Sequence, residues 1–243
     1  MIRAFAAGLV AQLRISAVTP LAVASAVLSP LAYGILVISS GSAPDIGITT
    51  GIAAAGIWTT TLTSALFAVL GERRARTLQL LVTAPTSMAW PLLGRVVGGA
   101  VQGLTAVPAS LLAVSLIWQV PAFGDPVILA AALLLILIGC AAMSAFLVGF
   151  LVRYRFFAGM INGFFGLVTF LTGMFVPVAA LQPAGRRIAE LLPPTSAMSA
   201  VREQSYAELG FGCVVLLLWL VAAVCYLSLA ERRIRRISSA FLA

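Results

Sequence analysis

Six long apolar runs dominate the 243-residue sequence, and nearly all of the charge lies in the short segments between them. A helix that crosses a bilayer needs about 20 apolar residues at about 1.5 Å rise each, and every run is long enough. Both faces of each run are apolar, which disfavours a transmembrane β-barrel with its alternating strands. The sequence therefore predicts an all-α integral membrane protein, one domain over 1–243, with six transmembrane helices. The expected spans are 15–38, 46–70, 96–118, 127–152, 156–180 and 211–230.

The composition agrees with a bilayer location. Apolar residues make up 62% of the chain and charged residues only 9%, so a soluble fold would expose too much hydrocarbon. Residues Ala24, Ser25 and Ala26 resemble a signal-peptide cleavage site. The run 15–38 is longer than a signal core and follows a polar segment, so we expect a retained helix.

The basic residues exclude several chemistries, because all fifteen are Arg and the chain has no Lys or His. A Walker A phosphate loop needs Lys, and His metal sites or Ser-His and Cys-His catalytic pairs need His. The three cysteines fall inside apolar runs without paired spacing, so we interpret Cys140, Cys213 and Cys225 as apolar packing residues. We expect no metal, no cofactor and no catalytic residue on this chain.

Energy for uphill transport would have to come from a partner. Every Asp and Glu lies in a loop or at a helix end, so proton or sodium coupling lacks intramembrane ionisable groups. The pI near 10.7 is also typical of nucleic-acid-binding proteins. The arginines instead bracket the apolar runs, which indicates contact with lipid headgroups and no nucleic-acid partner.

The placement of the arginines predicts the topology. Twelve of the fifteen precede the first run, follow the last, or lie in the second-to-third and fourth-to-fifth connections. By the positive-inside rule both termini are cytoplasmic. Arg95, beside Trp90, is expected to lie at the interface and extend its side chain toward water.

Two segments outside the spans are amphipathic. Segment 1–14 has apolar residues at helical spacing between Arg3 and Arg14, which predicts a helix on the cytoplasmic leaflet, with a frayed tail as the alternative. The cytoplasmic connection 71–87 predicts a short amphipathic helix at the membrane surface. Its charged residues and apolar ladder are Glu72, Arg73, Arg74 and Arg76, then Leu78, Leu81 and Val82, ending at Pro85.

The external segment 181–210 is punctuated by proline, which favours a re-entrant helical hairpin over a simple loop. Its prolines and those beside it are Pro177, Pro183, Pro193 and Pro194. A short amphipathic helix is expected between them, carrying Arg186, Arg187 and Glu190.

Small and polar residues line one face of two expected spans. On 46–70 these are Thr60, Thr63 and Ser64. On 156–180 the face and its neighbours comprise Asn162, Phe165, Gly166, Thr169, Thr172 and Gly173. Small residues allow close helix packing, whereas a polar stripe beside Phe and Met could line a solute path. The sequence leaves both interpretations open.

The connection 71–87 resembles that of the type-2 ABC transporter permeases of bacterial exporters. The resembling pattern is Glu72-Arg73-x-x-Arg76-Thr77-Leu78-x-Leu80-Leu81-x-Thr83-x-Pro85, in which Arg76 replaces a usual Gly and Gln79 a common Glu. The late segment is similar too, with a Leu-Pro-x-Thr-like turn at 191–195 followed by Arg202. The resemblance covers nearly the whole chain.

The resemblance implies a non-catalytic permease subunit in the bacterial plasma membrane, exporting a drug, antibiotic, lipid or similar solute. It implies a second permease, identical or a sibling, and two copies of a separate ATPase that carries ATP and Mg. The coupling residues would be Glu72, Arg73, Arg74, Arg76, Thr77, Leu78 and Leu81. The external re-entrant residues would be Pro177, Pro193, Pro194 and Arg202. An ATP-independent facilitator and a non-transporting scaffold are the alternatives, and the arginines of 71–87 could also bind lipid headgroups.

Overall fold

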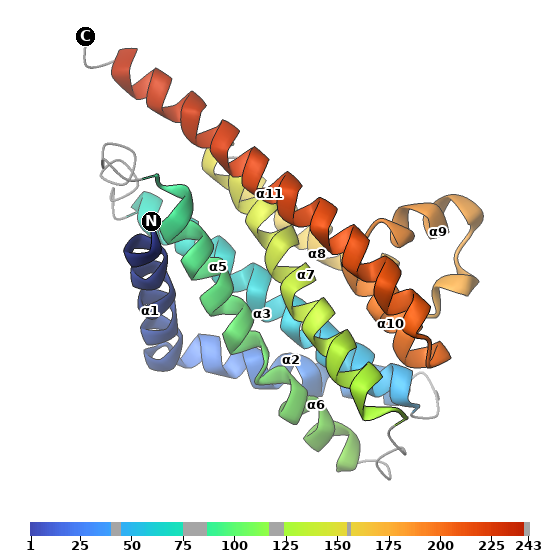
Figure 1. The fold of residues 1–243 in the computed structure, drawn as a ribbon. Coiled ribbons are helices and arrows are strands. Elements are labelled where there is room, and N and C mark those ends of the chain that lie inside the picture. The colour runs from blue at the N-terminus through green and yellow to red at the C-terminus, as the bar shows by residue number, and fades with distance from the viewer. Residues whose placement is uncertain (40–44, 75–86, 117–123, 155–156, 241–243) are drawn as a thin grey trace.

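The computed structural model describes residues 1–39, 45–74, 87–116, 124–154 and 157–240, and within these ranges the chain is helical apart from turns (Figure 1). This confirms the all-α prediction for the described residues. The α-helices are α1 Ile2–Val18, α2 Pro20–Ser39, α3 Ile46–Arg74, α5 Ala89–Gly103, α6 Ala106–Ser115, α7 Pro126–Arg153, α8 Phe157–Leu171, α9 Pro183–Glu190, α10 Pro193–Glu203 and α11 Tyr206–Ala240. A 3₁₀ helix, η1, covers Val178–Ala180.

Four helical stretches in the described part of the chain are long and apolar enough to cross a membrane. They are Ile46–Arg73, Ala89–Ser115, Pro126–Arg153 and Tyr206–Arg235. A bilayer offers no hydrogen-bond partners to a backbone, so apolar runs of this length satisfy their own N–H and C=O groups as helices. The chain is therefore a multi-pass membrane protein.

The expected first span, 15–38, is wrong as one continuous helix. Thr19 has extended dihedral angles (φ −89°, ψ 107°) and divides α1 from α2, so residues 15–18 belong to α1. Pro20 is the physical reason, because a proline disfavours the helical conformation of the residue before it. The segment expected at 1–14 is thus a longer helix, and the apolar run that follows begins at Pro20.

The expected third span, 96–118, begins earlier and is interrupted. Helix α5 starts at Ala89, and a turn at Leu104 and Thr105 separates it from α6. Pro108 has no N–H to offer the Leu104 carbonyl, which instead accepts from the N–H of Val107 at 3.0 Å. The tighter turn kinks the stretch without breaking its path.

The fifth and sixth expected spans also have different bounds. Helix α8 stops at Leu171, well before 180, and Gly173 adopts a positive φ of 73° that few residues other than glycine tolerate. With 15 residues, α8 is about 22 Å long, short of the roughly 30 Å hydrocarbon core. Helix α11 runs well past 211–230 in both directions, from Tyr206 to Ala240.

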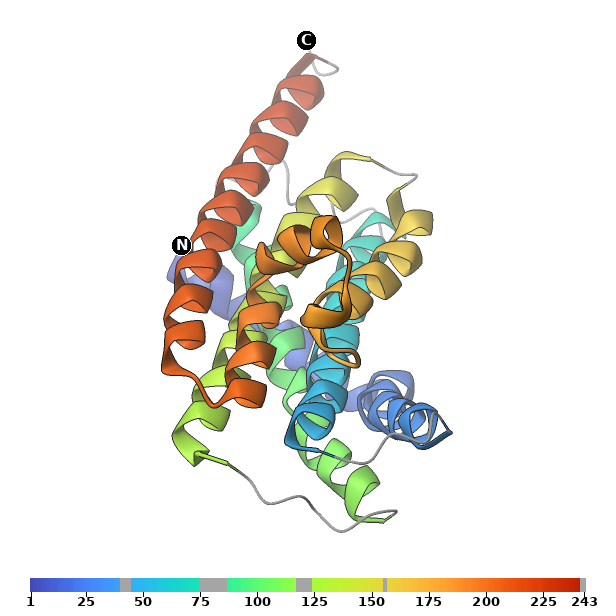
Figure 2. The same ribbon diagram turned by 90° about the vertical axis from the view of Figure 1, so that its right-hand side faces the viewer.

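Helix α3 is the centre of the bundle, and α2, α5, α6, α7 and α10 pack around it (Figures 1 and 2). Its large side chains Ile52, Ile57, Trp58 and Leu62 are completely or almost completely buried. Such burial explains why this helix, unlike α11, presents little apolar surface to its surroundings. Any displacement of α3 must therefore be accommodated by several neighbours at once.

Helix α1 lies lengthwise against α5 (Figure 1). Glycines on both helices permit this contact, because a Cβ on Gly8 would lie within 3 Å of the Pro91 backbone, and one on Gly94 within 3 Å of the Leu9 backbone. The larger apolar side chains Val10 and Leu13 are exposed. Small residues inside and apolar residues outside are typical of helix packing in lipid. Whether α1 rests on the leaflet surface stays a prediction.

The bundle has two distinguishable ends. The end of α3, the start of α5, the end of α7 and the C-terminal part of α11 lie together, and we call this the loop end (Figure 1). At the opposite end, Asp125 caps α7 by accepting a hydrogen bond from the N–H of Val127 at 2.8 Å, and it accepts a second one from the Tyr206 hydroxyl of α11. Gln204 donates from its side chain to the Val201 carbonyl and accepts from the N–H of Asp125 at 2.7 Å.

Candidate functional site: the base of the 75–86 connection

The candidate site consists of the end of α3 and the start of α5, which flank the connection 75–86 in sequence and which we call its two stems. Helix α3 ends at Arg74 and α5 begins at Ala89, so both stems lie at the loop end. The predicted coupling residues Arg76, Thr77, Leu78 and Leu81, and the side chain of Arg74, lie outside the described residues. Glu72 and Arg73 are described, and both make contacts within the chain.

Glu72 and Arg95 form an ion pair between α3 and α5, in which the Arg95 Nη2 donates to the Glu72 Oε1. Only 11% of the Glu72 side chain and 18% of the Arg95 side chain are exposed. The sequence-based expectation that Arg95 extends toward water at the interface is therefore wrong: its guanidinium turns toward the bundle. A carboxylate this enclosed needs a charged partner, and only tertiary packing brings Arg95 within reach.

Arg73 caps the end of α7. Its Nη2 donates to the carbonyl oxygens of Leu151 and Val152, the latter at 3.0 Å. The last carbonyls of a helix have no partner inside that helix and carry its partial negative charge. A cation from a neighbouring helix satisfies both needs, so the end of α3 is fastened to the end of α7.

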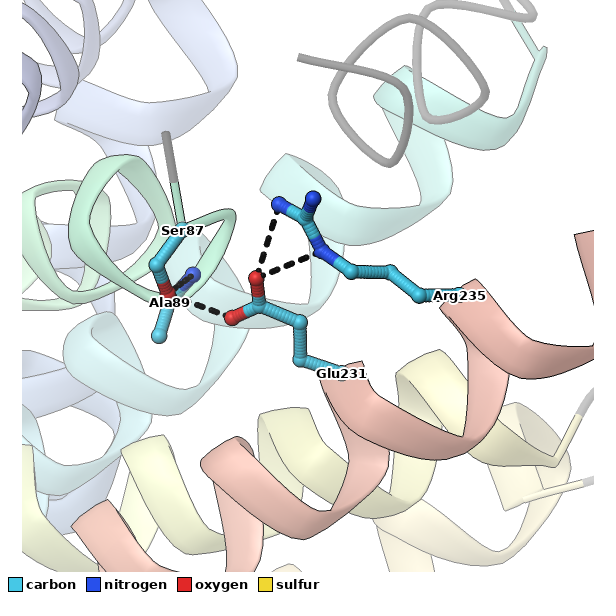
Figure 3. Close-up of polar contacts among 4 residues, drawn as sticks. All are labelled: Ser87, Ala89, Glu231 and Arg235. Carbon is cyan, nitrogen blue, oxygen red and sulfur yellow. Dashed lines mark hydrogen bonds and ion pairs between the residues drawn. The ribbon is translucent and has the colours of Figure 1, made fainter. Parts of the chain in front are cut away.

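Ser87 and Glu231 fasten the other stem to α11. The Ser87 hydroxyl donates to the Glu231 Oε2 and accepts from the N–H of Ala89 at 3.3 Å (Figure 3). The Glu231 Oε1 accepts from the Nε and Nη2 of Arg235, each at 2.9 Å. Glu231 is 8% exposed, so its carboxylate is buried with both oxygens engaged.

Aromatic stacking joins α7 and α11 close to the loop end. The rings of Phe150 and Tyr226 stack with their centroids 4.5 Å apart, and Phe146 meets Tyr226 at 5.1 Å. A Cβ on Gly149 would collide with the Tyr226 ring, so this approach requires glycine. The two helices that receive the stems are thus packed together. We call Glu72, Arg73, Ser87, Arg95 and Glu231 the stem network.

The stem network joins four helices, α3, α5, α7 and α11, at the two ends of the connection 75–86. The α3 stem contacts α5 and α7, and the α5 stem contacts α11. Charged and hydrogen-bonded contacts between close-packed helices resist independent motion, because breaking one leaves a buried polar group unpaired. A force on residues 75–86 would therefore be passed to α5, α7 and α11 as well as to α3.

The predicted polar face of α3 turns into the bundle. Thr60 is 1% exposed, and its Oγ1 has no hydrogen-bond partner among the described residues. The Ser64 hydroxyl donates to the Gln102 Oε1 of α5 at 3.4 Å, and Thr63 is half-buried. A Cβ on Gly99 would lie 2.6 Å from the Ser64 Cβ, so this face permits the close approach of α5. Packing accounts for Ser64, whereas Thr60 stays unexplained by its contacts.

The predicted stripe on α8 is not gathered into one polar surface. The Thr169 and Thr172 hydroxyls donate to carbonyls of their own helix, each at 2.8 Å, and both residues are buried. Phe165 is half-buried, whereas a Cβ on Gly166 would meet nothing within 4 Å. The Asn162 side chain lies outside the described part of the structure. Among the described residues, none covers the α8 face around Gly166.

The proline-rich segment forms two helices, as predicted for its amphipathic part. In α9, Arg186 Nε lies 3.1 Å from Glu190 Oε1. Pro177 precedes η1, and Pro193 and Pro194 open α10, where missing N–H groups cost nothing. Arg202 lies against α3, since a Cβ on Gly47 would be 2.7 Å from its Cγ and Nε.

Sequence reasoning assigned no role to Ser87 or Glu231, and it missed the partner of Arg95. One local signal was available, because Glu231 precedes Arg235 by four residues on a helix, the spacing that favours an ion pair. The contact to Ser87 has no such signal. In the described ranges, no group of three or more His, Cys, Asp and Glu side chains could hold a metal ion.

The helical bundle with several long apolar helices defines a polytopic membrane protein. The chain matches the ABC-2 type transporter family over residues 3–206, and it belongs to that family. The family consists of non-catalytic permease domains without a cofactor of their own, and they generally pair with ATPase subunits that hydrolyse ATP. A search among curated proteins finds no match to the chain.

Proposed function

We propose that this chain is the permease subunit of an ATP-driven exporter that moves a hydrophobic or amphipathic solute outward across a bacterial plasma membrane. The stem network is the observation that carries the proposal, because both stems of 75–86 are fastened to other helices. A connection built only to join two helices needs no such anchoring. A connection that receives force from a separate ATPase needs anchoring to several helices, since the force must reach the whole bundle.

The topology proposed with this function has six spans and cytoplasmic termini. Helix α2 would supply one of the two spans beyond the four long apolar stretches, and it contains the apolar helical segment Val27–Val37. The predicted span 156–180, in which α8 is continued by the residues up to Ala180, would supply the other. Twelve of the fifteen arginines lie in the segments assigned to the cytoplasm, which supports placing the loop end there. The segment 181–210 then faces outward.

The coupling residues divide by role under this proposal. Glu72 and Arg73 hold the base of the connection, as their contacts to Arg95 and to α7 support. The residues that would meet the ATPase, which binds ATP and Mg, are Arg74, Arg76, Thr77, Leu78 and Leu81. Two ATPase copies would serve two permease chains, either identical or siblings.

The uncovered face of α8 supports the presence of a second permease chain or a solute path beside it. No described residue lies within 4 Å of a Cβ on Gly166, and Leu167 and Phe170 are exposed along the same helix. Asn162, Phe165, Thr169, Thr172 and Gly173, together with Thr60, Thr63 and Ser64 of α3, are the proposed path or dimer residues. Pro177, Pro193, Pro194 and Arg202 belong to the proposed re-entrant segment.

The test is co-purification of the tagged full chain with an ATPase from its native membranes, followed by measurement of ATP hydrolysis. We expect an Arg76→Glu/Leu78→Asp double variant to fold and reach the membrane but to lose the ATPase. Arg232→Glu, a charge reversal at an exposed position of the same end, is the matched control and should keep it. A double variant that still carries an active ATPase would remove 75–86 as the coupling segment.

An ATP-independent facilitator or a scaffold gives different results in the same preparation. A facilitator would move solute in vesicles without ATP and would carry no ATPase. A scaffold would transport nothing. Wild-type chain that purifies without any ATPase while catalysing solute movement would therefore refute the exporter proposal.

A further inference from the structure

A cavity of about 400 Å³ lies between η1, α9, α10 and the start of α11, away from the loop end. Its walls combine charged, hydroxyl and apolar side chains, of which Arg186, Glu190, Thr195, Glu203, Glu208 and Phe211 carry the argument. The volume is within the range of small-molecule sites, about 300 to 1,000 Å³. In Figure 2, α9 and α10 lie next to each other on the face toward the viewer.

The unbalanced charge of the cavity is negative. Glu190 is already paired with Arg186, at 3.1 Å. Glu203 and Glu208 form no ion pair with any described residue. Two carboxylates without cationic partners in one cavity attract a positively charged group.

The position of Glu203 is unfavourable for its own helix. It is the last residue of α10, and Gln204 follows in the left-handed conformation with φ of 51°. The C-terminus of a helix carries a partial negative charge, so a carboxylate there is repelled. Glu208 lies in the first turn of α11, where the partial positive charge of the helix N-terminus stabilises a carboxylate. The partial charge of α10 gives the Glu203 carboxylate no such stabilisation.

A buried hydroxyl points to a ligand independently of the carboxylates. Thr195 lines the cavity and is 3% exposed, and its Oγ1 has no hydrogen-bond partner in the part of the chain that the structure describes. A buried polar atom that lacks a partner is costly, so such atoms mark places where another molecule completes the bonding. The Thr195 oxygen can accept a hydrogen bond from a cationic N–H group.

Arg202 also lines the cavity but does not cancel its negative charge. Its side chain runs toward Gly47 of α3 and Gly173, and its buried Nη2 has no hydrogen-bond partner among the described residues. Burial lowers the pKa of the Arg202 guanidinium, and the charge of Asp45 opposes this shift. With Arg202 counted, the lining still holds three carboxylates, those of Glu190, Glu203 and Glu208, against two guanidinium groups, those of Arg186 and Arg202.

We propose that this cavity binds an organic cation, with its ammonium group between Glu203 and Glu208 and its apolar part against Phe211 and Val178. Thr195 accepts a hydrogen bond from the ligand, and the exposed Phe211 ring adds a cation–π surface. That the cation is exported rests on the proposed function. Under that function, organic cations are the class of solute that passes the outward-facing segment.

The test measures binding of ethidium, a fluorescent organic cation, to the purified full chain in nanodiscs of zwitterionic lipid, without any ATPase. Saturable binding of ethidium and none of the anionic dye fluorescein is expected. A Glu203→Gln/Glu208→Gln variant should bind ethidium about tenfold more weakly or worse, because a charged hydrogen bond is lost. Asp125→Asn, which removes a carboxylate near the same end but outside the cavity, should leave the affinity unchanged.

A second variant covers the case in which the double variant does not fold. Ser199→Leu fills the cavity without changing its charge, and it should abolish ethidium binding while the size-exclusion profile stays that of the wild type. Wild-type binding that is not saturable, fluorescein binding in place of ethidium, or undiminished affinity in folded variants would overturn the proposal. Failure here leaves the exporter proposal standing, since that proposal is judged by the ATPase, which this experiment omits.

Discussion

The Ser87 hydroxyl donates a hydrogen bond to the Glu231 carboxylate, joining two residues that are 144 positions apart. This bond fastens the start of α5 to α11 directly after the connection 75–86 in the sequence. Glu231 is held from its other side by Arg235 (Figure 3). The second stem is therefore anchored to a neighbouring helix, as is the first, which Glu72 and Arg73 hold.

Ser87→Ala should loosen the start of α5 without unfolding the chain. A hydrogen bond to a charged group contributes about 1.5 to 3 kcal/mol, and its loss also leaves one oxygen of the buried Glu231 unpaired. Hydrogen exchange of the first turn of α5 should become faster than in the wild type. Ser115→Ala is the control, because that hydroxyl donates only to the Leu112 carbonyl of its own helix. Equal protection of α5 in both variants would show that the Ser87 bond anchors nothing.

The Glu72–Arg95 pair should show strong coupling in a double-mutant cycle. Arg95→Leu alone removes the ion pair of a largely buried carboxylate, so we expect about 1 to 3 kcal/mol of destabilisation, below the roughly 3 to 5 kcal/mol typical of fully buried pairs. Glu72→Leu in the same chain should recover much of that loss. Thermal unfolding in detergent measures each variant.

The exposed Arg186–Glu190 pair is the matched control for this cycle. Its side chains are 60% and 47% exposed, so removing either should change stability by only about 0 to 1 kcal/mol. If Arg95→Leu were equally harmless, the Glu72–Arg95 contact would be a surface pair without structural weight.

The lengths of the apolar runs predicted which segments are helical. The residues at which the helices end depend on single backbone groups. Hydrocarbon around the chain forces every long apolar run into a helix, so α3, α7 and α11 follow directly from the sequence. The breaks at Thr19 and Leu104 arise from prolines inside apolar runs, whose effect on a single carbonyl or dihedral angle is invisible to a count of apolar residues.

The candidate site was predicted in part for a similar reason. Local pattern identified Glu72 and Arg73 because charges that interrupt apolar sequence are conspicuous. Their partners follow from tertiary packing: Arg95 is 23 positions away and Val152 is 79 positions away. No local spacing rule connects groups at such separations, so the anchoring of both stems required the structure.

Glycines of the α1–α5 contact should be far less replaceable than those of the open α8 face. A Cβ at Gly94 would lie 2.8 Å from the Leu9 backbone nitrogen, and backbone cannot move aside cheaply, so Gly94→Ala should separate the two helices. Gly163→Ala meets nothing within 4 Å and removes a poor helix former, gaining up to about 1 kcal/mol.

Thermal unfolding of the two alanine variants tests this contrast. The Tm of Gly94→Ala should fall by several degrees, and that of Gly163→Ala should stay level or rise. A Gly94→Ala variant as stable as the wild type would mean that α1 does not pack against α5 as described.

The Asp125–Tyr206 contact should make stability depend on pH in a predictable direction. The Tyr206 hydroxyl, and secondly the Val127 N–H, lower the pKa of Asp125 in the folded chain below its ordinary value. A carboxylate with a lowered folded pKa contributes its full stability above the ordinary unfolded pKa of about 3.9, and loses it as pH falls through the folded pKa.

Tyr206→Phe removes the larger of these two causes, so the Asp125 pKa should return toward its ordinary value. The variant should therefore unfold at a lower Tm than the wild type at pH 7, and the two Tm values should converge as the pH falls from about 4 through the lowered folded pKa, below which the Asp125 carboxylate is protonated in the folded wild type as well. Tyr226→Phe is the control, because Tyr226 stacks on Phe150 through its ring, and any Tm difference it causes should not change with pH. A constant gap between wild type and Tyr206→Phe from pH 7 to pH 3 would show that the Tyr206 hydroxyl acts through packing and not through the Asp125 charge.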